Sequence, residues 1–121
     1  MTRKSEVRNG MRPIHPGEIL REEFIEALAM SANALAIALR VPAPRVNDIV
    51  RERRAISPDT ALRLARYFGT TPQFWMNLQA SYDLKVASRS SGGQIRRDIS
   101  PRAPQSFSFS RTPRSTAASR G

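Results

Sequence analysis

The chain has 121 residues, enough for one small domain with a modest core, and its lack of cysteine excludes disulfides and thiolate metal sites. No apolar run approaches the ~20 residues needed to cross a bilayer, and the polar first ten residues lack a secretory signal, so we expect a cytoplasmic protein without membrane contact. The net charge of +10 favours polyanionic partners, but residues 88–121 alone carry +6 of it and residues 1–87 carry +4.

The first predicted helix begins near Pro16 and ends at about Leu28. Proline suits a first helical position, because its missing N–H would have no partner there in any case. Leu20, Phe24 and Leu28 recur every four residues, which is typical of one buried helix face.

A second helix is predicted to start after Ser31, whose hydroxyl can accept a free backbone N–H. It should stop near Arg40, because Val41 precedes Pro42 and is disfavoured in the α region. A third helix is predicted to start around Ala43 or Pro44. The predicted inner faces are Leu35, Ala36 and Leu39 in the second helix and Val46, Ile49 and Val50 in the third.

Two further helices have clear starts. Ser57-Pro58-Asp59 combines an N-cap, a first-turn proline and an early acid, and Gly69 supplies the matching stop. Thr71-Pro72 repeats the start signal for a last helix that should end near Ala87. The apolar positions are Ala61, Leu62, Ala65 and Phe68 in the fourth helix and Phe74, Trp75, Leu78 and Tyr82 in the fifth. The sequence therefore predicts an all-α domain of five helices over residues 11–87.

The flanking segments differ in composition from this domain. Residues 1–10 are predicted to be a flexible N-terminus. Residues 88–121 are rich in Ser, Arg, Pro and Gly, and their few apolar residues show no regular spacing. This composition predicts a disordered basic tail. The tail would either add non-specific nucleic-acid affinity or be an inert extension.

Residues 31–39 and 43–51 fit the template of a helix-turn-helix, in which two short helices are joined by a turn of 3–4 residues. The second helix of such a pair enters the major groove of DNA and reads base edges with its first turns. The alternative is an ordinary helical hairpin with a solvated basic rim.

Several side chains around the third helix suit DNA contact. Arg45 can pair with guanine O6 and N7 in a fork, and Asn47 can pair with adenine. Asp48 can accept from cytosine N4 or orient a neighbouring arginine, whereas Asn33 and the arginines after the helix suit phosphates. The predicted DNA-binding residues are Asn33, Ala43, Pro44, Arg45, Asn47, Asp48, Arg51, Arg53 and Arg54.

Four stretches carry a resemblance to a known family. They are Arg12-Pro13-Ile14-His15-Pro16-Gly17-Glu18-Ile19-Leu20, Asn33-Ala34-Leu35-Ala36, Arg54-Ala55-Ile56-Ser57 with Thr60-Ala61-Leu62-Arg63-Leu64-Ala65, and Phe68-Gly69-Thr70-Thr71-Pro72-Gln73-Phe74-Trp75-Met76-Asn77-Leu78-Gln79. On these motifs Met11–Ala87 resembles the HigA-type antitoxins, a branch of the lambda-repressor-like, XRE-type helix-turn-helix proteins.

The resemblance implies a homodimer that represses its own operon at an inverted repeat of double-stranded DNA. It also implies an antitoxin that neutralises a HigB-like ribonuclease toxin by direct contact. It assigns the dimer interface to Phe74, Trp75, Leu78 and Tyr82, although aromatic rings at helical spacing usually belong to a core. Where the family usually has turn glycines, this chain has Arg40 and Glu52.

Other classes have little support. A metal site needs several ligands, and His15 is the only histidine, so packing or a hydrogen bond at a helix start is the expected role. We find no pattern typical of an enzyme and expect no cofactor. The alternatives that remain are a stand-alone transcriptional regulator without a toxin and a protein-binding helical adaptor with incidental basic charge.

Overall fold

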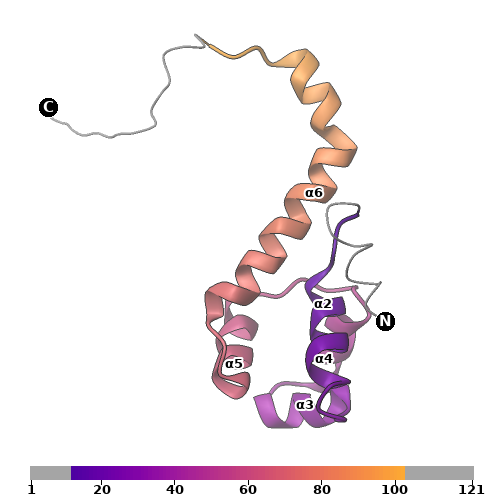
Figure 1. Cartoon of the computed structure of the whole chain (residues 1–121), viewed down its shortest axis with the longest axis vertical. Helices are drawn as coiled ribbons and strands as arrows, with labels where there is room; N and C mark the ends of the chain where they lie inside the picture. The colour runs from indigo at the N-terminus through magenta and orange to yellow at the C-terminus, as the bar shows by residue number, and fades with distance from the viewer. Residues whose placement is uncertain (1–11, 103–121) are drawn as a thin grey trace, which may run out of the picture. The chain divides into compact units, whose positions relative to one another are not determined.

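The computed structural model describes residues 12–102, and every regular element in this range is a helix (Figure 1). The elements are α2 (Pro16–Ile19), the π-helix η1 (Leu20–Ile25), α3 (Ala32–Leu39), α4 (Ala43–Val50), α5 (Pro58–Phe68) and α6 (Pro72–Asp98). Because α2 runs directly into η1, they form one helical segment, and the predicted all-α fold of five helices is confirmed. No helix within the described range is long and apolar enough to span a membrane.

The predicted capping residues lie at the helix starts. The Ser31 hydroxyl accepts from the N–H of Ala34 at 3.0 Å, and the Ser57 hydroxyl accepts from that of Thr60 at 3.2 Å. Gly69 ends α5 with φ of 76°, in the left-handed region that glycine enters without strain. These local signals therefore set the bounds of α3 and α5.

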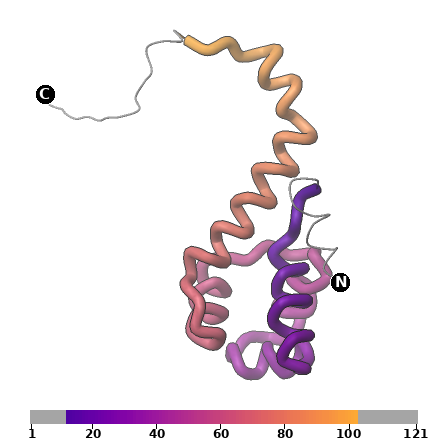
Figure 2. The backbone as a smooth tube through the Cα atoms, in the orientation of Figure 1, coloured from indigo at the N-terminus to yellow at the C-terminus, as the bar shows by residue number. Residues whose placement is uncertain are grey.

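The core of residues 12–90 is built by all five helical segments around one large aromatic side chain, Trp75 of α6. Leu20 from η1, Leu35 from α3, Ile49 from α4 and Leu64 from α5 are also buried with at most 1 % exposure. The tube in Figure 2 follows the same chain path, in which α2 contacts α4 and α3 contacts both α4 and α5. The core therefore holds α3 and α4 against their neighbours.

Three details of the prediction were wrong. The first helix ends at Ile25 and not near Leu28, because the chain turns through Ala29 at φ of 55°, and Leu28 is exposed. Leu62 is exposed as well, and Leu64 takes the inner position of α5.

The last helix also differs from its prediction, since α6 continues to Asp98 instead of ending near Ala87. Part of the segment predicted to be disordered, residues 88–98, is therefore helical. The predicted flexible N-terminus, residues 1–10, and the end of the tail, residues 103–121, lie outside the described residues.

Candidate nucleic-acid interface

The turn between α3 and α4 keeps the geometry of a glycine turn although it has none. Arg40 has φ of 61° and ψ of 45°, and its N–H donates to Ile37 O at 3.1 Å. The N–H of Val41 donates to Ala36 O at the same distance, so both amides bind carbonyl groups of α3. The chain therefore tolerates a left-handed conformation at a non-glycine residue, at a cost of about 1 kcal/mol.

The helix α4 is strongly two-sided. Val46 and Ile49 are buried at 1 % and 0 % exposure and fix the helix to the core. Of the predicted DNA-binding residues of α4, Pro44 is exposed, and Ala43, Arg45, Asn47 and Asp48 are half-buried, with Ala43 packed against the core. One edge of α4 thus remains accessible to a partner.

Asn47 is joined to the start of α3. Its Nδ2 donates to Asn33 Oδ1 at 2.9 Å and to the carbonyl of Ala43 at 3.0 Å. The structure therefore brings together two predicted DNA-binding side chains from different helices, and both amides keep further hydrogen-bonding capacity.

Arg45 is held by an acid from a third helix. Its Nη1 donates to Oδ2 of Asp59, in the first turn of α5, at 2.7 Å. Asp59 also accepts from Arg63, and the hydrogen bonds from Arg63 and then Arg45 lower the pKa of its carboxyl group. Sequence reasoning missed this contact, because no local pattern links residues 14 positions apart.

The arginines after α4 form an exposed basic edge. Arg51, Arg53 and Arg54 are all exposed. Arg54 lies 3.6 Å from the carboxylate of Asp48, which gives Asp48 a partner within the chain. An ion pair that is this accessible to solvent contributes little to stability.

A second missed contact supports the end of α4. Nη1 of Arg21 in η1 donates to the carbonyl of Val50, the last residue of α4, and its Nη2 lies 3.4 Å from the carboxylate of Glu52. A guanidinium at a helix C-terminus satisfies a free carbonyl and complements the helix dipole. Glu52 has φ of 64° and turns the chain away from α4.

The four residues predicted for the dimer interface do not share one environment. Trp75 has no exposed surface, and its Nε1 donates to Thr70 Oγ1 at 2.8 Å. The structure therefore corrects the prediction for Trp75, because its ring is buried within its own chain and offers no surface to a partner. Phe74 is 38 % exposed, and Leu78 and Tyr82 are half-buried. One of the two adjacent rings thus points inward and the other stays accessible.

His15 has the structural role expected of it. Its Nδ1 accepts from the N–H of Gly17 at 2.8 Å and caps α2, and its ring meets that of Tyr82 edge-on at 4.8 Å between centroids. Burial lowers the pKa of His15, which keeps the accepting nitrogen free of a proton. In the part of the chain that the structure describes, no group of three His, Asp or Glu residues could hold a metal ion.

Known proteins share this architecture. The helix-turn-helix family matches residues 20–75. Virulence-associated protein I of Dichelobacter nodosus is 57 % identical over 82 residues, which are 68 % of this chain and 76 % of that protein.

Two solved structures extend the comparison. Pseudomonas aeruginosa antitoxin HigA with the higBA promoter is 60 % identical with a TM-score of 0.73, over 74 % of this chain and 98 % of that one. Antitoxin GraA in complex with its operator is 53 % identical with a TM-score of 0.74, over 78 % of this chain and 96 % of that one.

Proposed function

This chain belongs to the HigA-type antitoxins of the helix-turn-helix family, and we propose that it represses its own operon and neutralises a HigB-like toxin. The HigA and GraA structures were solved with promoter or operator DNA, and their names identify both proteins as antitoxins. A protein with these two roles acts in the cytoplasm, together with its operator and its toxin.

The accessible edge of α4 is the observation that carries the DNA-binding half of the proposal. Arg45, Asn47 and Asp48 are only half-buried, on a helix that Val46 and Ile49 fix in the core. An α-helix presented in this way fits the major groove, and the exposed arginines that follow it suit the flanking phosphates. We assign DNA contact to these residues together with Asn33, Ala43 and Pro44.

The remaining aromatic and aliphatic surface of α6 suits a dimer. Phe74, Leu78 and Tyr82 keep accessible surface on a helix that begins immediately after α5. A symmetric dimer would present two copies of α4, which matches an inverted repeat of two half-sites about one helical turn apart.

A titration with two duplexes tests DNA binding. Fluorescence anisotropy should give tighter binding to a duplex from the region upstream of the gene than to a scrambled duplex of equal length. Binding should weaken with salt, with a log–log slope of about −0.9 for each phosphate neutralised. Equal affinity for both duplexes would contradict a role as a repressor.

Co-expression tests the antitoxin role. The adjacent small reading frame, if it encodes the toxin, should arrest growth alone, and this chain should restore growth and co-purify with the product. Binding to the promoter without any rescue of growth would favour a stand-alone regulator over an antitoxin.

A further inference from the structure

The carboxylate of Asp59 joins α5 to the DNA-facing edge of α4. Its Oδ2 accepts from Nη1 of Arg45 at 2.7 Å and from Nε of Arg63 at 2.9 Å. Asp59 therefore lies between two guanidinium groups, one of which belongs to the helix that we propose enters the groove.

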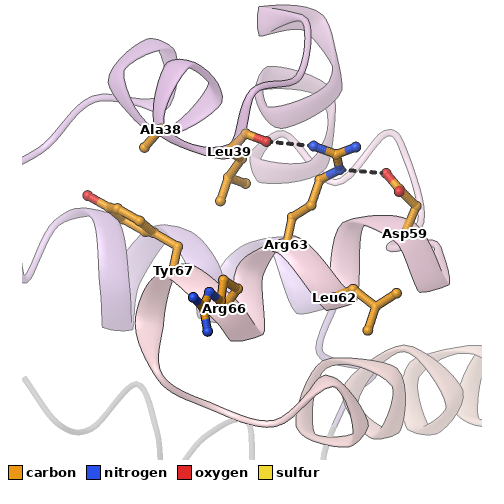
Figure 3. Close-up of a pocket in the computed structure, with 7 residues that line it drawn as sticks. All are labelled: Ala38, Leu39, Asp59, Leu62, Arg63, Arg66 and Tyr67. Atoms are coloured by element: carbon orange, nitrogen blue, oxygen red, sulfur yellow. Dashed lines mark hydrogen bonds and ion pairs between the residues drawn. The ribbon is translucent and has the colours of Figure 1, made fainter.

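Arg63 ties this carboxylate to a third helix. Figure 3 shows the Arg63 guanidinium reaching Asp59 with one nitrogen and the carbonyl of Leu39, the last residue of α3, with another. The distance from Arg63 Nη1 to Leu39 O is 2.9 Å. The three helices α3, α4 and α5 thus meet through one chain of hydrogen bonds that ends on Arg45.

The surroundings of this network are open. Asp59 and Arg63 line a groove of about 550 Å³ between α3 and α5, and the Asp59 side chain is 55 % exposed. An exposed ion pair contributes little to the stability of a fold. We therefore expect the ion pair between Asp59 and Arg45 to affect the geometry of Arg45 more than the stability of the domain.

Arg45 keeps most of its donors while it is held. A guanidinium has five N–H donors in a rigid plane, and Asp59 engages Nη1 alone of the Arg45 nitrogens. The Arg45 side chain is 29 % exposed, so part of it stays accessible. A side chain already fixed in one orientation loses less conformational freedom when it binds a base.

We propose that Asp59 is a positioning residue for DNA recognition, which holds the Arg45 guanidinium in the orientation that reads a base and is itself held by Arg63. The inference rests on the proposed function as a sequence-specific DNA-binding protein. Asp59 need not touch DNA in this role. Its negative charge opposes DNA binding in general, so a gain in specificity is the expected benefit of keeping an acid here.

The substitution Asp59→Asn tests the proposal, because it keeps the side-chain size and removes the charge. Affinity for the upstream duplex should fall about tenfold, in the range of one well-formed base contact, and preference at a single base position should flatten. Affinity for a scrambled duplex should stay the same or rise, since one negative charge has been removed. A merely structural role would not separate the two duplexes in this way.

Two controls isolate the mechanism. Glu26→Gln makes the same charge change at an exposed residue outside α3 and α4, and it should not lower affinity for the upstream duplex. Arg63→Lys keeps the charge but loses the planar fork, and it should lower specificity less than Asp59→Asn does. Thermal unfolding of each variant checks that the domain remains folded.

A double-mutant cycle with Arg45→Ala decides whether Asp59 acts through Arg45. Asp59→Asn should cause no further loss of specificity once Arg45 is alanine. The positioning role of Asp59 would be overturned if Asp59→Asn lowered specificity as much in the Arg45→Ala background as in the wild type. It would also be overturned if Asp59→Asn alone kept the wild-type preference for the upstream duplex. Neither result would contradict the proposed function. A wild type without any preference between the duplexes would overturn the proposed function and this inference with it.

Discussion

Gly17 of α2 lies directly against the backbone carbonyl of Ile49 in α4. A Cβ atom on residue 17 would lie 1.8 Å from the Ile49 oxygen and 2.8 Å from its carbonyl carbon. Both atoms belong to a helix backbone, which cannot swing aside as a flexible side chain can. The absence of a side chain at Gly17 therefore sets how closely α2 packs against the helix that we propose reads DNA.

Gly17→Ala should lower the free energy of unfolding by about 2–3 kcal/mol, because α2 and α4 must move apart to admit the methyl group. Urea unfolding followed by circular dichroism would measure the loss. Gly93→Ala is the matched control: its Cβ would meet Arg97 at an ordinary 3.5 Å, and alanine favours helix, so no loss is expected. Equal stability of both variants would show that α2 can shift without cost.

Gln79 should be another residue on which stability depends. The residue is 6 % exposed, and its Oε1 accepts from the backbone N–H of Ile56 at 2.7 Å. Gln79→Leu would leave that buried N–H without its acceptor, and we expect a loss of about 1–3 kcal/mol.

The exposed Gln73 offers a comparison on the same helix, since it bonds only to the neighbouring Asn77 among the hydrogen bonds described. Gln73→Leu should change the free energy of unfolding by less than about 0.5 kcal/mol. Similar losses for Gln79→Leu and Gln73→Leu would mean that the Ile56 amide finds another acceptor.

Acid should destabilise the fold through His15. Burial lowers its pKa in the folded state below the ordinary 6.5, so the unfolded chain binds the proton more readily. The stability is fully present above the unfolded pKa and is lost as the pH falls through about 6.5 toward the folded-state pKa.

The measurement is the urea midpoint between about pH 5 and 8, compared with His15→Asn. Asparagine can accept the same hydrogen bond from Gly17 as an N-cap but does not titrate in this range. The urea midpoint of the wild type should therefore decrease relative to that of His15→Asn as the pH falls. Parallel profiles would show that His15 has the same pKa in both states.

Arg45→Ala should lower affinity for the upstream duplex by about 1–3 kcal/mol and flatten preference at one base position. The reason is the loss of a side chain that can read guanine from the accessible edge of α4. Competition against duplexes substituted one base pair at a time would identify that position. If binding to the upstream and scrambled duplexes weakened equally, Arg45 would be a phosphate contact.

The sequence predicted the features that depend on neighbours along the chain. Ser31 and Ser57 mark helix starts through bonds to residues three positions away, and Gly69 marks a helix end. The contacts of Arg21 with Val50 and of Arg45 with Asp59 escaped prediction, because they join residues 29 and 14 positions apart that only the tertiary fold brings together.

The wrong end of α6 has a different cause. Residues 88–98 include three serines and two glycines, Gly92 and Gly93, which are poor helix formers, and this composition led to the prediction of disorder. The helix nevertheless continues to Asp98. Propensity is a weak guide where a helix is already nucleated by the turns before it.

Trp75 is an intrinsic fluorescent probe of folding. It is the single tryptophan, it is fully buried, and its ring lies 5.0 Å from that of Phe24 and 6.5 Å from that of Phe68 between centroids. Its fluorescence emission therefore reports on the interior alone and should shift to the red when the chain unfolds. A labelled duplex can then be followed at another wavelength in the same cuvette, so loss of structure and loss of DNA binding become separate signals.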